Sequence, residues 1–132
     1  MTSKFVTSND GTQIYAEAQG NFSNPHLIFL HGLSSNASVF DPLFAHPKLK
    51  QHFYMVRYES RGHGRSGKPS NAEAYTSETY AQDWDAVAKA FKVVKPIHVG
   101  WYVSVDLFLN VLCSSPRSPV SFRSLGGAFL AN

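Results

Sequence analysis

Hydrophobic residues in the first hundred positions form short runs that polar and glycine-containing segments separate. Two short runs at 5–7 and 13–16 flank an Asn-Asp-Gly segment at 9–11, and an Asp-Gly pair in that position predicts a β-hairpin. Three continuous apolar runs, typical of strands buried on both faces of a parallel sheet, follow at 26–30, 53–58 and 97–99. The pattern therefore predicts an antiparallel hairpin and then parallel strands.

Residues 76–91, between the second and third apolar runs, have the periodicity of an amphipathic helix. Its apolar face is formed by residues three or four positions apart, namely Tyr80, Trp84, Val87, Ala88 and Phe91. Thr76 or Ser77 can cap the helix, and a shorter helix is predicted over 38–44 with Pro42 in its first turn. Strands that alternate with helices after a hairpin predict an α/β fold with one antiparallel edge.

Composition and charge limit the classes of function. The chain has 132 residues, 43% of them hydrophobic and 16% charged, which suits one globular domain. The net charge is +3, and the clustered basic residues are Arg57, Arg61, Arg65 and Lys68. Glycines interleave with this cluster and no block of five or six basic residues occurs, so a structured turn is favoured over a nucleic-acid surface. The apolar stretch 97–113 is too short and too polar to predict a membrane span.

The cysteine and histidine content predicts neither a disulfide nor a metal site. Cys113 is the single cysteine, and the six histidines do not recur at the spacing of metal ligands. The first nine residues lack the apolar core of a signal peptide. We therefore expect a cytoplasmic protein without a metal or other cofactor.

Three glycine-containing motifs follow the predicted parallel strands. The first is Leu30-His31-Gly32-Leu33, and the second is the nine-residue segment 58–66, which reads YESRGHGRS. The third is divided: Gly100-Trp101 ends one strand, and Ser124-Leu125-Gly126-Gly127 begins 22 residues later. Joined directly, these two pieces would read Gly-Trp-Ser-Leu-Gly, the G-x-S-x-G pattern of a turn that exposes a nucleophilic serine between a strand and a helix.

Taken together and in this order, the motifs resemble the N-terminal half of the α/β-hydrolase family, over residues 5–101 and again from Ser124. The resemblance implies an incomplete α/β-hydrolase sheet and, for the intact protein, a serine hydrolase that acts on an ester or similar small acyl substrate. It implies that Ser124 is the nucleophile if the turn is restored. The oxyanion donors would be the backbone N–H groups of Leu33 and Leu125. Glu59 stands where the family usually has aspartate.

The other motif residues are interpreted as structural. His31 is expected to be a turn residue hydrogen-bonded to backbone groups, and Arg61 to join its loop to the fold through a carboxylate or carbonyls. His63 is expected to be structural or on the surface, and His98 to be a hydrogen-bonded core residue. The motif residues assigned to this group are His31, Gly32, Glu59, Arg61, Gly62, Gly64, Ser66, Gly100, Gly126 and Gly127.

The segment 102–123 separates the two halves of the third motif and resembles nothing in the family. The sequence thus divides into an α/β-hydrolase part at 1–101, an insert at 102–123, and a remnant of the nucleophile turn and helix start at 124–132. The codons that can encode residues 101–104 are compatible with a splice donor site. An AGG codon for Arg123 would be compatible with a splice acceptor site. The insert is therefore interpreted as a short retained intron, with a genuine insertion as the alternative.

The residues after Ser124 contain no Asp, Glu or His, and all six histidines precede it. In this fold the chain order is nucleophile, acid and then histidine, so the written chain lacks both partners of the serine. We therefore expect it to be truncated and inactive, and to leave the strand that ends at Trp101 as an exposed edge. The alternative reading is a non-catalytic product: an isoform, a gene-model fragment or a degenerate binding module.

Overall fold

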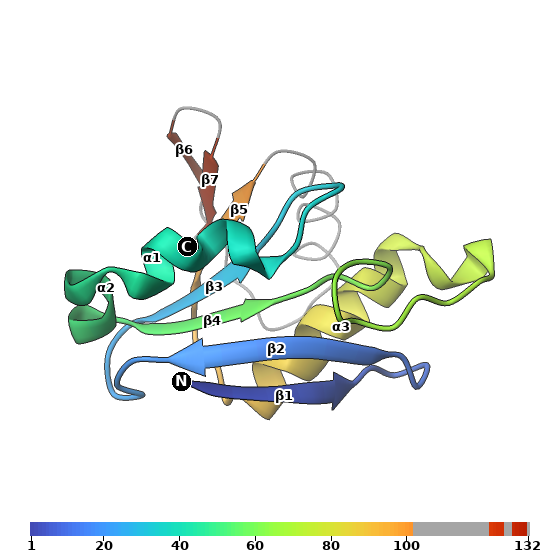
Figure 1. Ribbon diagram of the computed structural model, residues 1–132, viewed down its shortest axis with the longest axis horizontal. Coiled ribbons are helices and arrows are strands. Elements are labelled where there is room, and N and C mark those ends of the chain that lie inside the picture. Colours follow the sequence, from blue (N-terminus) through green and yellow to red (C-terminus); the bar gives the residue numbers. More distant parts are fainter. Residues whose placement is uncertain (102–121, 126–127, 132) are drawn as a thin grey trace.

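The computed structural model of the chain describes residues 1–101, 122–125 and 128–131 (Figure 1). In these ranges the strands are β1 (Thr2–Thr7), β2 (Gln13–Gln19), β3 (His26–Leu30), β4 (Tyr54–Tyr58), β5 (Ile97–Trp101), β6 (Phe122–Leu125) and β7 (Ala128–Ala131). The α-helices are α1 (Asp41–Ala45), α2 (Pro47–His52) and α3 (Ser77–Ala90), and two 3-10 turns span Ala37–Phe40 and Ala72–Ala74.

The strands form one mixed sheet in the order β1-β2-β4-β3-β5-β7-β6. β1 and β2 make the antiparallel hairpin predicted around Gly11, whose φ of 89° is the conformation that glycine allows in such a turn. β2 then pairs antiparallel with β4, while β3 pairs parallel with both β4 and β5. The predicted order of an antiparallel hairpin followed by parallel strands is confirmed.

The C-terminal strands differ from the sequence-based expectation. β7 pairs antiparallel with β5, and β6 pairs with β7, so β7 covers the edge of β5 that we expected to be exposed. Ala128–Ala131, expected at the start of a helix, is a strand instead. A nucleophile helix must follow its strand directly, whereas here 22 residues separate Trp101 from Ser124. That separation lets the segment turn back and pair with the open edge of β5.

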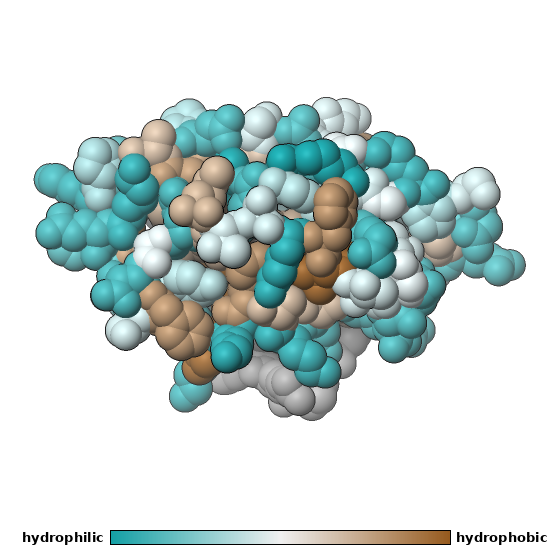
Figure 2. All heavy atoms as spheres, turned by 60° about the horizontal axis from the view of Figure 1, so that its bottom comes forward, coloured by the Kyte–Doolittle hydropathy of each residue, from teal (hydrophilic) through white to brown (hydrophobic). Residues whose placement is uncertain are grey.

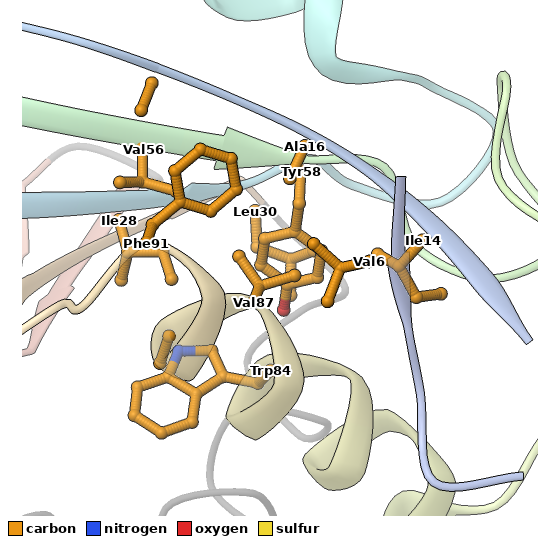
Figure 3. Close-up of a cluster of buried hydrophobic side chains, with 12 residues drawn as sticks. Val6, Ile14, Ala16, Ile28, Leu30, Val56, Tyr58, Trp84, Val87 and Phe91 are labelled. Atoms are coloured by element: carbon orange, nitrogen blue, oxygen red, sulfur yellow. The ribbon is translucent and has the colours of Figure 1, made fainter. Parts of the chain in front are cut away.

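Helix α3 forms where the apolar periodicity predicts it and buries that face against the sheet. Thr76 is its N-cap: the Thr79 N–H donates to Thr76 Oγ1 at 3.2 Å. Trp84, Val87 and Phe91 are buried against side chains from β2, β3 and β4 (Figure 3). Full burial of a side chain of this size contributes about 1.5–3 kcal/mol, so this face holds α3 on the sheet.

The opposite face of the sheet carries a second, smaller core. Leu27 and Phe29 alternate along β3 with Ile28 and Leu30, which belong to the α3 side, because successive side chains of a strand point to opposite faces. Phe29 packs on Phe40 and Phe44, with ring centroids 5.1 and 5.4 Å away. The sheet therefore lies between α3 on one face and the 3-10 turn with α1 on the other.

The exposed hydrophobic side chains of the described residues are scattered. On the face seen in Figure 2, hydrophobic residues form small patches among hydrophilic ones. Exposed large hydrophobic residues in the described ranges include Phe5, Phe22, Leu33 and Val94. Scattered exposure of this kind is ordinary for a protein surface. None of the helices described here has the length and apolar character needed to cross a bilayer.

Candidate functional site

The three motif-bearing strands end at the same level of the sheet. Leu30 of β3 is in register with Tyr58 of β4 on one side and with Gly100 of β5 on the other. The loops 31–34 and 59–66 therefore leave the sheet side by side at its carboxyl edge, next to the end of β5. In α/β folds this edge, where strands give way to loops, is the usual place for a binding or catalytic site.

His31 is buried and both of its ring nitrogens are engaged. Nδ1 lies 2.8 Å from the Gly32 carbonyl oxygen, and the Ser60 N–H donates to Nε2 at 3.1 Å. Burial lowers the pKa of His31, and the neighbouring His63, whose ring centroid is 5.1 Å away, acts in the same direction. A neutral imidazole with both nitrogens occupied is not placed to take a proton from a nucleophile, so the contacts of His31 are those of a turn residue.

Glu59 and Arg65 fix the conformation of the glycine-containing loop. Glu59 is buried, and its carboxylate accepts from the Arg65 N–H at 2.5 Å and from Arg65 Nη2 at 3.1 Å. Burial alone would raise the pKa of Glu59, but the hydrogen bonds from Arg65 outweigh it and hold the pKa below its ordinary value. Gly64, with φ of 51°, makes this possible because a Cβ there would stand 2.3 Å from Glu59 Oε2.

Ser66 joins the same loop to β2. Its buried hydroxyl donates to the Glu59 carbonyl at 2.6 Å and accepts from the Tyr15 N–H at 2.9 Å. Gly62 adopts φ of 81°, and a Cβ there would meet the ring of Tyr75 at 3.0 Å. Ser66 and Gly62 therefore determine the backbone conformation of the loop that follows β4.

Arg61 is a buried structural cation. Nε and Nη2 bind the two oxygens of Asp83 at 2.8 and 2.6 Å, and Nη1 reaches Asp10 at 2.7 Å and the Ala74 carbonyl at 2.6 Å. The hydrogen bonds that Arg61 donates to Asp83 raise the pKa of Arg61 further, and the hydrogen bonds to Arg61 lower the pKa of Asp10 to about 2. Arg61 thus joins the hairpin turn at Asp10, the 3-10 turn at Ala74 and helix α3 at Asp83.

Sequence reasoning missed a second buried arginine cluster. Arg57 of β4 donates to Glu17 of β2 at 2.7 Å, to Asp41 at 2.5 Å and to the Ala37 carbonyl at 2.9 Å. Its guanidinium also lies 4.4 Å from the ring centroid of Phe44. The only sequence signal was a charged residue inside an otherwise apolar strand, because a buried charge is almost always paired. The cluster anchors α1 and the preceding turn, and so the loop that follows β3.

His98 and His63 lie where the sequence suggested, one inside the sheet and one in a loop. His98 of β5 is buried and stacks on Trp84, with ring centroids 5.4 Å apart. Burial lowers the pKa of His98 to about 4, so it is neutral at physiological pH. His63 is half-buried, and its Nδ1 lies 3.1 Å from the Arg61 carbonyl oxygen.

Ser124 lies in β6, away from the turn after β3. Gly100 is in register with Phe129 of β7, and Phe129 with Ser124, so Ser124 is three strands from Leu30. With neighbouring strands about 4.8 Å apart, this places the Ser124 backbone about 14 Å from that of Leu30. Leu125 ends the same strand. The role of Ser124 as nucleophile concerns a form in which it follows Trp101 directly, and it stays a prediction.

Of the remaining predicted site residues, the structure describes Leu33 but not Gly126 or Gly127. Leu33 is exposed in the turn after β3, and it is followed by Ser34 with a φ of 59°. Gly126 and Gly127 lie outside the described residues. Among the residues that the structure describes, no group of three or more His, Cys, Asp or Glu could hold a metal ion.

The fold and the edge just described define an α/β-hydrolase. The family described as "alpha/beta hydrolase fold" matches residues 25–101, more than half of the chain, and the protein belongs to this family. The match runs from the start of β3 through the end of β5, so it includes the strand ends and loops that form the candidate site.

Particular relatives support the same assignment. The chain is 36% identical over 97 residues to the probable oxidoreductase EphD of Mycobacterium tuberculosis, a match that covers 74% of this chain and 16% of that protein. It is 31% identical over 119 residues to the bifunctional esterase/perhydrolase DCH of Acinetobacter calcoaceticus, covering 89% and 41%. A putative aryl esterase from Burkholderia cenocepacia superimposes with a TM-score of 0.82 at 30% identity, covering 88% and 43%. The chain thus spans less than half the length of these proteins.

Proposed function

We propose that the intact protein is a serine hydrolase that cleaves an ester or a similar acyl bond of a small molecule. Ser124 would be the nucleophile when Ser-Leu-Gly follows Gly100-Trp101 directly, and the N–H groups of Leu33 and Leu125 would bind the oxyanion. An attacking serine needs such donors, and each typically contributes about 3 kcal/mol to stabilising the transition state. A cytoplasmic location is part of this proposal and rests on the sequence pattern alone.

One observation carries the proposal: the shared register of Tyr58, Leu30 and Gly100. It places the turn after β3, the loop after β4 and the end of β5 at one edge. A serine two positions beyond Gly100, at the tip of a sharp turn, would therefore stand beside the Leu33 turn. The esterase names of DCH and of the Burkholderia structure support the substrate class.

A different observation favours a second candidate for the 132-residue chain itself, a non-catalytic product. Its Ser124 lies in β6, paired with Phe129 rather than placed at the end of β5. The eight residues that follow Ser124 in the sequence include no Asp, Glu or His to serve as its base or acid. Because general-base help is worth about 10²–10⁴-fold, we propose that this chain alone does not hydrolyse esters.

Hydrolysis of p-nitrophenyl acetate by two purified proteins separates the two candidates. The first is the 132-residue chain. The second is the product of a transcript in which the codons of Trp101 and Ser124 are joined and the coding sequence beyond codon 132 is restored. We expect hydrolysis only by the second, and its loss in Ser124→Ala. Hydrolysis by the 132-residue chain that Ser124→Ala abolishes would overturn the non-catalytic reading, and an inactive joined protein would overturn the hydrolase proposal.

Transcript sequencing tests the origin of the 102–123 segment. We propose that it is a retained intron, which predicts transcripts that join codon 101 to codon 124 and continue Gly-Trp-Ser-Leu-Gly-Gly. Transcripts that always contain the intervening codons would instead identify it as a genuine insertion.

A further inference from the structure

The direction of the Leu33 N–H is set by the peptide that links Gly32 to Leu33. A trans peptide is planar, so its C=O and N–H groups point in opposite directions. Whatever holds the Gly32 carbonyl therefore also aims the Leu33 N–H. The next residue, Ser34, has a φ of 59°, which residues other than glycine adopt at a cost of about 1 kcal/mol. A turn with such strain needs an external group to hold it.

His31 supplies that group, and its protonation state follows from its contacts. The Ser60 N–H can only donate, and it lies 3.1 Å from His31 Nε2, so Nε2 must accept. The ring proton of the neutral imidazole is therefore on Nδ1, which donates to the Gly32 carbonyl at 2.8 Å. Because only 3% of His31 is exposed, water does not compete for either contact.

We propose that His31 is a positioning residue that locks the Gly32–Leu33 peptide so that the Leu33 N–H points away from the imidazole, toward the end of β5. Ser60 lies after β4, and β4 and β5 flank β3 on opposite sides. The carbonyl drawn toward the imidazole thus turns the N–H away from it. Ser60 selects the tautomer, so the loop after β4 controls the donor on the turn after β3.

The catalytic meaning of this lock rests on the proposed function, but its geometry does not. If the joined protein proves inactive on esters, the hydrolase proposal fails while the orientation of the Leu33 N–H remains measurable in the 132-residue chain. If the joined protein is active and the N–H is not held by His31, the positioning proposal alone fails.

Nitrogen-15 NMR of the 132-residue chain tests the tautomer without any substitution. We expect His31 to show a protonated Nδ1 and an unprotonated Nε2, with a scalar coupling from the Ser60 amide nitrogen to Nε2. His26 is a matched internal control of opposite tautomer, since its Nδ1 accepts from the Val94 N–H at 2.9 Å and its Nε2 lies 2.9 Å from the Phe22 carbonyl. A protonated Nε2 in His31 at neutral pH would overturn the proposal.

Residual dipolar couplings of backbone N–H groups test the orientation. In His31→Phe the Leu33 coupling is expected to shift by more than that of any residue in β3, and in His63→Phe it is expected to stay unchanged. An unchanged Leu33 coupling in His31→Phe would overturn the positioning role. Should His31→Phe fail to fold, the tautomer and the Ser60 coupling in the unsubstituted chain decide the question.

Discussion

Replacing Arg61 with methionine would leave the buried carboxylate of Asp83 without its cation. The side chains of Arg61 and Asp83 are 0% and 1% exposed, and two contacts of 2.8 and 2.6 Å join them. Removing one member of a buried ion pair typically costs about 3–5 kcal/mol, because the other charge stays out of water. Methionine retains an unbranched apolar stem, so lost packing is the smaller part. The expected loss is a large share of the roughly 5–15 kcal/mol that stabilises a natural domain.

Urea unfolding followed by tryptophan fluorescence measures this loss, since Trp84 adjoins Asp83 on α3. The control is Lys68→Met. Among the described residues, Lys68 Nζ donates to the Gly64 and Ser66 carbonyls of its own loop and forms no ion pair, so we expect a change within about 0.5 kcal/mol. A double variant, Arg61→Met with Asp83→Leu, removes both charges and is expected to regain much of the stability.

Two outcomes would refute the reasoning about Arg61. If the single variant lost less than about 1 kcal/mol, Asp83 would not depend on the guanidinium for its burial. If the double variant were as unstable as the single one, the loss would come from packing or from the other Arg61 contacts rather than from an uncompensated carboxylate.

Three further changes test other parts of the site. Gly64→Ala is expected to lower the free energy of unfolding by about 1–3 kcal/mol, because φ is 51° and the new Cβ would meet Glu59 Oε2 at 2.3 Å. The control Gly11→Ala, with φ of 89° and open space around it, is expected to cost less. Equal losses on urea unfolding would contradict this. Ser66→Ala is expected to cost about 1–3 kcal/mol in the same assay, because the lost hydroxyl leaves a β2 N–H and a loop carbonyl unsatisfied; a loss under about 0.5 kcal/mol would contradict this. His98→Gln is expected to flatten the pH dependence of stability. The pKa of His98 is about 4 in the folded chain and about 6.5 when unfolded. Its contribution to the free energy of unfolding is therefore complete above pH 6.5 and falls by on the order of 3 kcal/mol toward pH 4. A pH dependence of stability that is the same in His98→Gln would contradict this.

The elements that could be predicted from sequence are those whose signal is local. The apolar face of α3 repeats within one helix and its cap, Thr76, stands at the boundary, so both the helix and its start follow from adjacent residues. The buried strands β3, β4 and β5 are continuous apolar runs for the same reason. The shorter helix predicted over 38–44 divides into a 3-10 turn, which the Asn36 side chain caps, and α1, which begins at Asp41 and has Pro42 in its first turn.

The contacts that could not be predicted depend on pairing between distant strands. Arg57 and Glu17 meet because β2 and β4 pair antiparallel with these two residues as register partners, which neither local sequence encodes. Asp83 is similar: on the helix face it is one charged residue among several, and only the folded loop brings Arg61 to it. The motif identified Glu59, but the close approach of Glu59 to Gly64 depends on the path of the loop, which the motif does not define.

The sequence from Ser124 onward suits two structures, a β-hairpin and a strand-to-helix turn. The number of residues between Trp101 and Ser124 decides which of them forms. Leu125 pairs with Ala128, so two residues, both glycine in the sequence, separate β6 from β7. Gly-Gly is among the sequences preferred in a two-residue hairpin loop, and small residues are also what a strand-to-helix nucleophile turn requires. With 22 residues between Trp101 and Ser124, the segment has enough chain to reverse and pair antiparallel with β5. Joined directly to Trp101, the segment would have no spacer in which to reverse, and we propose that it would instead form the turn toward a helix.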